Sequence, residues 1–596
     1  MKKILLVFAL VVCSTAILLA QRTVSGTILD ENSEALIGAT VVGENTTIGT
    51  VTDFDGKYTL NVPEGTTRLV VSYTGYATQT LTLGASNVLD IVMAIDAVGL
   101  EDIIVTGYAP QKRKDITGSV SSVSVKDIEN VQLPSFEAAL QGRAAGVNVN
   151  KNSGTPGGGI DVNIRGRTSI TASNQPLYVV DGVPLISGDN FDFTQQGVGN
   201  GQISVLADLN PEEIESIEVL KDASSAAIYG SRAANGVVLI KTKGGSSGGK
   251  TKVTLNASYG NQWLPNQIDV VDGPQYIEYI TQVFGANIVG TEANNNWQDL
   301  IFQTGTLQKY SANISGGTDK TQFFGSLGFS GDEGIMRNSN FDRYSGRLNV
   351  KHIASDKLTF NMNVGYTKSE TQQIQNDNNI FGALSTAILL PPVVPIRNED
   401  GSFGSAFGLE NPVAAVTQYS NFVDRNRLIG SVNASYNIID DLSVNARLGV
   451  DLLSLTEDVL EPRTLQSSAT GTAVFGTVTN NRFIHEYFLK YNAKVGGGSL
   501  QALAGLSFQE DALKNSFIEV VDFPTDDFTG ISSGSTTVNA LGAEQGDNLQ
   551  SYFGNINYNY KGKYYLTATF RVDGSCLLYT SPSPRDQRGS RMPSSA

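Results

Sequence analysis

Apolar and polar residues alternate along much of the chain, and this alternation dominates the sequence after residue 250. In KLTFNMNVGY, residues 357–366, the even positions are apolar, whereas Thr359, Asn361 and Asn363 are polar. A period of two is that of a β-strand with one apolar and one polar face. The same period returns in other segments, at 442–452, 552–560 and 564–572. Residues 251–575 are therefore predicted to form antiparallel strands.

Short turns and long loops separate these strands. IIDDL, 438–442, and YKGKY, 560–564, are short, whereas the polar stretches 372–424 and 521–548 are long. Strands of about ten residues, with aromatic residues near their ends, are typical of a transmembrane β-barrel. A soluble β-sandwich also alternates and stays the alternative. We expect about thirteen strands before residue 575, counted from the period of two.

A smaller β-sandwich is predicted for residues 22–96, where short alternating runs are separated by turn signals. One of these turns is DFDGK, residues 53–57. Asp53 and Asp55 before Gly56 also resemble part of a calcium loop, but the closing glutamate of a helix-loop-helix site does not follow. We interpret this stretch as a hairpin turn.

The segment LEDIIVTGYAPQKRKD, residues 100–115, joins a short β-prone run to a basic, polar stretch. It has no partner strand nearby in the sequence and no helical period. One interpretation is a linker. The other is a strand held in reserve, which another protein captures by pairing main chain with main chain.

Residues 116–243 are predicted to form a compact mixed α/β unit. Asn210 is placed to cap a helix, and Glu213 to close a capping box. Asp222 is placed to cap a second helix, rich in Ala and Ser, before the apolar strand 237–240. Small residues in that helix predict close packing against other backbone.

The stretch GGSSGGKT, residues 244–251, fits the phosphate-binding pattern G-x-x-x-x-G-K-[ST]. A phosphate loop needs a helix that begins at the Lys-Thr pair, so that backbone N–H groups and the helix dipole converge on the anion. Residues 252–259 alternate instead and predict a strand. We interpret residues 244–250 as a Gly/Ser hinge.

The N-terminus, MKKILLVFALVVCSTAILLAQ, has two lysines, an apolar run and small residues up to Ala20. This is the anatomy of a secretory signal peptide, assigned to residues 1–20. Cys13 also allows a lipoprotein, but Val12 before it is not the small residue that such a site needs. Since the other cysteine is Cys576, we expect neither disulfides nor cysteine metal sites to support the mature chain.

The last stretch, residues 576–596, is rich in Ser, Pro and Arg and follows a well-formed strand. It resembles translated cloning or sequencing adaptor, and a disordered tail is the alternative. We exclude it from the fold prediction.

Composition limits the classes of function. A length of 596 residues predicts several domains, and a net charge of −16 without a basic stripe argues against nucleic-acid binding. After the signal, no apolar run approaches the roughly 18 residues of a spanning helix, so any passage through a membrane would use strands.

Catalysis has little support in the sequence. His352 and His485 lie in strand-like surroundings without metal-ligand spacing, and HEYF at 485–488 lacks the second histidine of a zinc motif. No nucleophile elbow stands in a strand-turn-helix context. We expect no enzyme activity, no metal and no cofactor.

The order of these parts resembles the SusC/RagA family of TonB-dependent outer-membrane transporters. Residues 22–96 resemble its carboxypeptidase-regulatory-like extension, and EDIIVTGY, 101–108, resembles its TonB box. TGSVSSVS, LQGRAAGVNV, IRGRTS, PLYVVDGVPL and IESIEVLKDASSAAIYGSRAANGVVLIKTK, between residues 117 and 243, are similar to its plug-domain signatures. WQDLIFQTG, 297–305, and ISGGTDKTQFFGSLGFSGDEGI, 314–335, resemble its first barrel strands.

The resemblance implies a mainly β protein with an N-terminal β-sandwich, a mixed α/β plug domain and a barrel of about 22 strands in the full-length family. It implies import of large nutrients, oligosaccharides or peptides, across the outer membrane of a Gram-negative bacterium. The implied partners are TonB with its inner-membrane ExbB/ExbD motor, a SusD-like surface lipoprotein, the glycan or peptide substrate and outer-membrane lipid.

The family would continue past RVDGS, residues 571–575. Because unpaired N–H and C=O groups in lipid cost several kcal/mol each, an open sheet edge is not expected there. We therefore expect the chain to be the N-terminal part of a transporter. The alternatives are a non-functional transporter fragment and a surface β-sandwich adhesin or assembly protein.

We hypothesise that energy arrives mechanically, since the outer membrane has no ATP and no sustained ion gradient. The residues expected to pair with TonB as an added strand are Glu101, Asp102, Ile103, Ile104, Val105, Thr106 and Gly107. Pulling on this segment would displace part of the plug.

Three arginines are candidates to pair with carboxylates of the barrel wall and seat the plug: Arg165, Arg167 and Arg232. Ordinary solvated arginines are the alternative. Asp181 and Gly182 are expected to shape a turn rather than to contact substrate.

Overall fold

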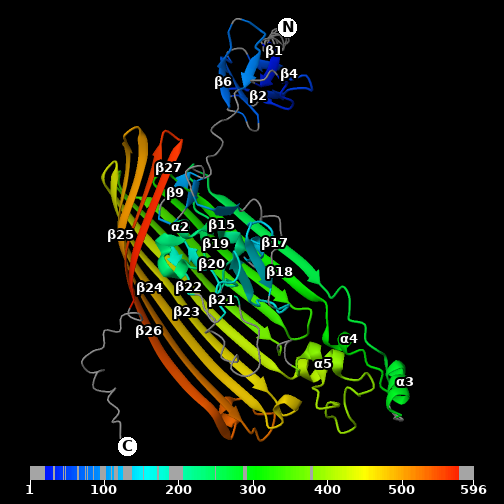
Figure 1. Cartoon of the computed structure of the whole chain (residues 1–596). Helices are drawn as coiled ribbons and strands as arrows, with labels where there is room; N and C mark the ends of the chain where they lie inside the picture. Colours follow the sequence, from blue (N-terminus) through cyan, green and yellow to red (C-terminus); the bar gives the residue numbers. More distant parts are fainter. Residues whose placement is uncertain are drawn as a thin grey trace, which may run out of the picture. The chain divides into compact units, whose positions relative to one another are not determined.

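The structure is a computed structural model (Figure 1). It describes residues 21–30, 34–93, 103–105, 107–108, 110–112, 118–124, 137–186, 204–285, 292–375 and 380–575, apart from residues 45, 47, 64–65, 74–75, 77, 85, 152, 171–172, 205 and 249. The predicted signal peptide and the 576–596 stretch lie outside the described residues. The chain divides into two compact units, Met1–Ile103 and Ile104–Ala596.

The first unit is a β-sandwich, which confirms the prediction. One sheet has the strand order β4-β1-β7 and the other β3-β2-β5-β6. Alternate side chains, such as Val24, Leu60 and Leu69, are buried in one apolar core. The strands are β1 (Gln21–Asp30), β2 (Thr40–Gly43), β3 (Gly49–Val51), β4 (Lys57–Pro63), β5 (Arg68–Ser72), β6 (Gln79–Thr82) and β7 (Ile91–Met93).

The DFDGK stretch is a turn, but it connects the two sheets of the sandwich. β3 and β4, on either side of it, belong to different sheets, so the predicted hairpin is wrong. The Asp53 carboxylate accepts backbone N–H bonds from Asp55 at 3.0 Å and Lys57 at 2.8 Å, and Gly56 has a φ of 75°. These are ordinary turn interactions. Alternation in the flanking runs does not tell which sheet each strand joins.

The segment expected to lack a nearby partner has one. β8 (Ile103–Val105) and β9 (Pro110–Lys112) form a two-stranded sheet. Gly107 between them has a φ of 86°, a left-handed conformation that glycine adopts readily. Strands of three residues are too short for a periodic signal, so the sequence did not reveal the pairing.

Residues 118–243 form the mixed α/β unit, called the plug below. Its main sheet has the order β10-β15-β16-β13-β14, and β11 pairs with β12. Ile217 and Val219 point to one apolar cluster and Leu220 to a second on the other side of the sheet. The elements are β10 (Val120–Ser124), η3 (Glu137–Ala139), β11 (Val147–Lys151), β12 (Ile160–Ile164), β13 (Leu177–Val180), β14 (Val183–Pro184), η5 (Pro211–Glu213), β15 (Ile214–Leu220), α2 (Ala223–Ala226), η6 (Ala227–Ala233) and β16 (Val237–Thr242).

Local capping predictions in the plug hold only in part. The Asn210 side chain accepts the backbone N–H of Glu212 at 3.1 Å, as expected of a cap. Glu213, predicted to close a capping box, is buried against an arginine of the large sheet instead. Asp222 occupies the cap position of α2 but makes no cap hydrogen bond, because its carboxylate accepts the backbone N–H of Ser119.

The remaining strands form one antiparallel sheet, called the wall, that curves around the plug (Figure 1). In the described residues it has eleven strands, each paired with its neighbour in sequence, so the expected thirteen is wrong. Residues 536–548, predicted as loop, belong to a strand of 25 residues. The strands are β17 (Lys252–Gln262), β18 (Gly305–Gly317), β19 (Thr321–Glu333), β20 (Asn340–Ile353), β21 (Leu358–Gln373), β22 (Ser420–Ile439), β23 (Leu442–Glu461), β24 (Thr472–Val495), β25 (Gly498–Val521), β26 (Thr536–Tyr560) and β27 (Tyr564–Ser575).

Short helices interrupt the connections between wall strands. α4, α5 and α6 pack around Trp297, Ile301 and Ala387 in an apolar cluster of their own. In the described part of the chain, no helix is long and apolar enough to cross a membrane. The helices are α3 (Gly273–Phe284), α4 (Trp297–Ile301), α5 (Ala383–Leu389), α6 (Pro412–Thr417), η7 (Gln466–Ser468) and η8 (Ile531–Ser533).

The two faces of the wall differ in polarity, and the apolar face is the exposed one. Leu255, Leu327 and Leu566 on the outer face are 75%, 70% and 62% exposed. Polar side chains such as Asn349 and Ser369 on the inner face are buried. A soluble sandwich would bury its apolar face, so this arrangement differs from the sandwich alternative.

The hinge sequence leads into a strand. β17 begins at Lys252, directly after the GGSSGGKT stretch, where a phosphate loop would require a helix. A Cβ on Gly245 would lie 2.2 Å from the backbone nitrogen of Phe323, so this glycine passes close to the wall. The phosphate-loop alternative therefore lacks its helix.

Glu218 is a buried carboxyl in the plug sheet. It is 3% exposed, the Ser216 hydroxyl donates to one carboxylate oxygen at 2.9 Å, and the other oxygen has no hydrogen-bond partner among the described residues. Burial raises the pKa of Glu218 from 4.5 to about 7, against the opposing effects of Ser216 and Lys241. Because the folded pKa lies above the unfolded one, stability falls as pH rises from about 4.5 through about 7.

We expect Glu218→Gln to remove most of this fall, which amounts to up to about 3 kcal/mol. Thermal unfolding of the purified protein at about pH 5 and about pH 8 measures it. Glu215→Gln, an exposed carboxylate on the same strand, is the control. A difference in Tm between Glu218→Gln and the parent that is the same at both pH values would contradict the prediction.

Candidate functional site

Arginines on the inner face of the wall contact the plug. Because side chains alternate along a strand, residues two apart on one strand share this face. Each of these guanidinium groups contacts a carboxylate or a carbonyl of the plug. They are Arg343, Arg347, Arg425, Arg427, Arg447, Arg482 and Arg571.

Two plug carboxylates, Glu213 and Asp208, form buried ion pairs with arginines of the wall. Arg347 Nε lies 2.7 Å from Glu213 Oε2, and both side chains are 4% exposed. Asp208 lies 3.2 Å from Arg425 and 3.6 Å from Arg427. A buried charge that loses its partner costs several kcal/mol, so these pairs favour a single position of the plug.

Other wall arginines bind the plug main chain. Arg343 donates to the carbonyl oxygens of Ala207 at 2.9 Å and Leu209 at 3.0 Å. Arg482 donates in the same way to two successive carbonyls, at 2.8 and 3.2 Å. The planar fork of a guanidinium group suits two acceptors at once, which makes these contacts directional.

The turn at Asp181 and Gly182 also faces the wall. The two residues have φ values of 48° and 86°, which confirms the predicted turn. The Asp181 carboxylate accepts the backbone N–H of Thr242 at 3.0 Å and its hydroxyl at 2.6 Å, and it lies 3.6 Å from Arg347. A Cβ at Gly182 would lie 2.6 Å from the Arg447 guanidinium, so a larger residue there would have to displace that side chain.

Within the part of the chain that the structure describes, Arg165 and Arg167 pair with carboxylates of the plug rather than of the wall, contrary to the expectation. Arg165 pairs with Asp222, and Arg167 lies 3.7 Å from Asp161. Both partners belong to the plug, and the arginine side chains are 55% and 70% exposed. The sequence does not show which acid each arginine pairs with. Wall carboxylates do face the plug, since Asp451 accepts the backbone N–H of Ile186 at 2.8 Å.

Arg232 does reach the wall, but its partner is an amide. It donates to the side-chain oxygen of Gln509, and its Nε has no hydrogen-bond partner among the described residues. Burial and the nearby Arg482 and Arg571 lower the pKa of Arg232 to about 10. The expected contact between Arg232 and the wall is thus present, but its hydrogen-bond partner among the described residues is not the expected carboxylate.

Tyr108, directly after the predicted TonB-pairing residues, is inserted between plug and wall. Its hydroxyl donates to Glu486 Oε1 at 2.6 Å. Its ring centroid lies 4.7 Å from that of Phe553 and 5.3 Å from that of Phe488. Arg447 lies over the same ring at 5.2 Å and pairs with Glu486 at 3.1 Å. Tyr108, next to the predicted TonB-pairing segment, is thus bound to four side chains of the wall.

Burial, with the nearby Glu486 carboxylate, raises the pKa of Tyr108 well above its usual range. The phenol therefore stays protonated and remains a donor. The TonB-pairing residues themselves are described only at 103–105 and Gly107. No local sequence pattern indicates the Tyr108 contact, because Tyr108 and Glu486 are 378 residues apart.

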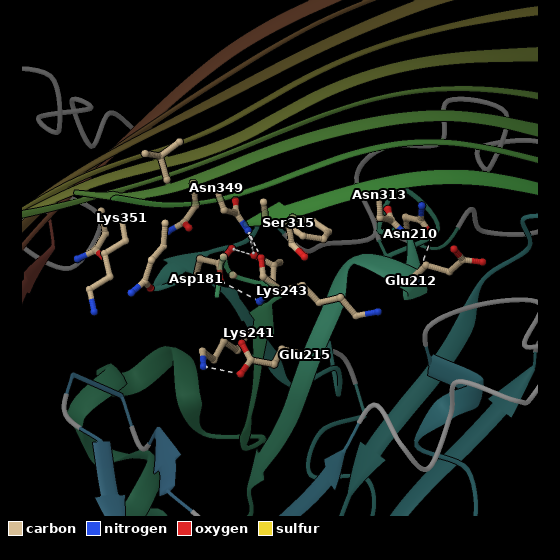
Figure 2. A pocket seen from close by; sticks show the side chains of 18 of the residues that line it. Asp181, Asn210, Glu212, Glu215, Lys241, Lys243, Asn313, Ser315, Asn349 and Lys351 are labelled. Atoms are coloured by element: carbon tan, nitrogen blue, oxygen red, sulfur yellow. Dashed lines mark hydrogen bonds and ion pairs between the residues drawn. The ribbon is translucent and has the colours of Figure 1, made fainter. Parts of the chain in front are cut away.

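A cavity of about 1470 Å³ lies between part of the plug and the wall. Figure 2 shows plug residues such as Lys241 and Glu215, joined by an ion pair, facing Asn349 and Lys351 of the wall. The volume exceeds the roughly 300–1,000 Å³ of small-molecule pockets.

Comparison with known proteins agrees with this architecture. Residues 112–237 match the TonB-dependent Receptor Plug Domain, and residues 24–105 match the CarboxypepD_reg-like domain. The chain is 32% identical to the TonB-dependent receptor SusC of Bacteroides thetaiotaomicron, in an alignment covering 100% of the chain and 60% of that protein. A TonB-dependent receptor of Formosa agariphila is 34% identical, with 94% and 56% covered.

The structure of the RagAB peptide importer in the open-open state has the same fold, with a TM-score of 0.67 and 24% identity over 80% of this chain and 56% of that chain. The chain thus spans about half the length of the relatives it matches. A plug held on the inner face of an antiparallel wall defines a TonB-dependent receptor. Within that class, over the part that it spans, the chain belongs to the SusC/RagA family.

The pair of Arg347 and Glu213 allows a double-mutant cycle. We expect Arg347→Ala and Glu213→Ala each to destabilise the seated plug by about 3–5 kcal/mol, since each leaves a buried charge unpaired. The double variant should cost clearly less than the sum. Protease resistance of the plug against denaturant measures these differences.

The exposed pair of Lys241 and Glu215 is the matched control, for which we expect less than about 1 kcal/mol of coupling. Strict additivity of the Arg347 and Glu213 substitutions would show that the two charges do not seat the plug together.

Proposed function

We propose that the protein imports large nutrients, oligosaccharides or peptides, across the outer membrane of a Gram-negative bacterium, with energy supplied by TonB. The observation that carries this proposal is a plug seated by buried charges on the inner face of a wall whose outer face is apolar. Exposed apolar side chains in strands that alternate with a polar inner face fit contact with lipid. The plug fills the inner side, so it has to move before a large solute passes.

The residues from Glu101 to Gly107 are the proposed handle for TonB. β8, inside this segment, already pairs with β9, so capture by TonB exchanges one strand partner for another. Tyr108 follows immediately and is bound to the wall, so a pull on the handle acts first on the Tyr108 contacts. The inner-membrane ExbB/ExbD motor is the proposed source of that pull.

The similarity to SusC and to the RagAB importer supports a SusD-like surface lipoprotein as a further partner. The name of the RagAB structure states that it imports peptides. For this chain, both oligosaccharides and peptides remain proposed substrates. The family relationship supports transport rather than catalysis.

Replacing Ile104 with proline tests the handle. Proline removes a backbone N–H donor, so we expect Ile104→Pro to reduce energised uptake to the level of cells without TonB. Ile104→Val keeps the donor and should leave uptake unchanged. The measurement is uptake by cells that express the protein from its full reading frame. Undiminished uptake by Ile104→Pro would exclude this segment as the handle.

Tyr108 provides a second test of the same mechanism. Tyr108→Ala removes the buried ring, and we expect it to lower the free energy that holds this segment in place by about 3–5 kcal/mol. The segment around Lys112 should then be cleaved by protease much faster than in the parent. Tyr108→Phe loses only the bond to Glu486 and should be intermediate. Tyr178→Phe, a buried plug tyrosine with a long 3.4 Å hydrogen bond, is the control. Equal cleavage of all three variants would contradict the anchoring role.

A further inference from the structure

The lining of the cavity between plug and wall carries more positive charge than the contacts that seat the plug require. The wall contributes cations to its lining and, among the described residues, no Asp or Glu. The chain as a whole has a net charge of −16, so this local excess of positive charge runs against its composition. The wall cations of the lining are Lys252, Lys309, Arg343, Lys351, Arg447 and Lys490.

The carboxylates of the lining lie on the plug, and each is already engaged. Glu215 pairs with Lys241 at 2.9 Å. Glu212 accepts a hydrogen bond from the Asn256 side chain at 3.0 Å. Asp181 is bound within its own turn, as described above. Three plug carboxylates thus face eight cations of the lining, the six of the wall together with Lys241 and Lys243 of the plug, so the lining keeps an excess of positive charge.

Three of these wall cations take no part in the described seating contacts. Lys252, Lys351 and Lys490 come from β17, β20 and β24, and none lies within ion-pair distance of a described carboxylate. Lys490 lies over the Phe488 ring at 5.2 Å. On each strand the lysine has the same parity as the inward-facing residues, such as Asn349 two positions before Lys351. Their ammonium groups therefore belong to the inner face.

The rest of the wall lining is rich in carboxamides and hydroxyls. Thr359, Asn361 and Asn363 follow one another at every second position of β21, and Asn433, Ser435 and Asn437 do so on β22. A carboxamide both donates and accepts hydrogen bonds, and a hydroxyl does the same. A surface of this kind suits a ligand with many hydroxyl groups, each of which also donates and accepts.

We infer that this cavity binds an acidic oligosaccharide, a carbohydrate that carries carboxylate or sulfate groups, on its way between plug and wall. The inference rests on the proposed import function and narrows its substrate class. The lysine ammonium groups pair with the acid groups, while the asparagine and threonine side chains bind the hydroxyls. A neutral glycan lacks the first feature, and an acidic peptide lacks the second.

Binding of defined probes to the purified protein, expressed from its full reading frame, tests the inference. The probes are oligogalacturonate, a sulfated oligosaccharide, neutral maltohexaose and hexaglutamate. We expect one or both acidic glycans to bind about tenfold or more tightly than maltohexaose and hexaglutamate. Which of the two binds distinguishes carboxylate from sulfate. Raising the salt from about 50 mM to about 500 mM should weaken acidic-glycan binding and leave any maltohexaose binding unchanged.

A lysine variant locates the site. The triple change Lys252→Gln, Lys351→Gln and Lys490→Gln should lower acidic-glycan affinity about tenfold. The control triple, Lys357→Gln, Lys494→Gln and Lys563→Gln, removes the same charge from β24 and from two turns between wall strands, all outside the lining, and should have no effect. A similar loss in both triples, or in neither, would overturn the assignment to this cavity.

The inference would be overturned if neither acidic glycan bound more tightly than maltohexaose, or if neither bound more tightly than hexaglutamate. These outcomes are separable from failure of the proposed function. If cells import maltohexaose in a TonB-dependent way without preferring acidic glycans, only the substrate class is wrong. If no probe is imported in a TonB-dependent way although acidic glycans bind, the import proposal fails and the site stands.

Discussion

Contacts between wall guanidinium groups and plug carboxylates and carbonyls hold this structure together. Arg347 with Glu213 and Arg427 with Asp208 are buried pairs, and loss of one partner from such a pair costs about 3–5 kcal/mol. The apolar contacts are shared as well, since Ile429 of the wall belongs to the main core of the plug. The plug therefore has a single defined seat, and its directional polar contacts can form again after they break.

The same register that seats the plug also sets the outer face of the wall. On β20, Arg343, Arg347 and Asn349 point inward, whereas Tyr344 and Leu348 are exposed on the other face. A slip by one residue would exchange the two sets, placing guanidinium groups outside and apolar groups against the plug. Seating of the plug and an apolar outer face, which the proposed contact with lipid requires, are therefore one constraint on the sequence, met strand by strand.

Local pattern predicted the sandwich, the plug and the antiparallel wall, because alternation and turn residues act over a few positions. Local pattern could not predict the contacts between plug and wall, since Arg347 and Glu213, for example, are 134 residues apart. The pattern around Glu213 predicts a capping residue, because it covers only the near neighbours of Glu213. Arg165 and Arg167 pair, among the described residues, with carboxylates of the plug itself, which no local pattern indicates. The prediction of strand boundaries was wrong where polar residues continue a strand, as at 536–548.

A reversible crosslink between plug and wall tests the central claim, that these contacts must break during each transport event. The Asn210 side chain donates to the Ser345 hydroxyl at 3.2 Å across the interface. Asn210→Cys with Ser345→Cys places a thiol pair there, in a chain with only Cys13 and Cys576 of its own. We predict that oxidation stops uptake and that reduction restores it. Full uptake by the completely crosslinked protein would contradict the account.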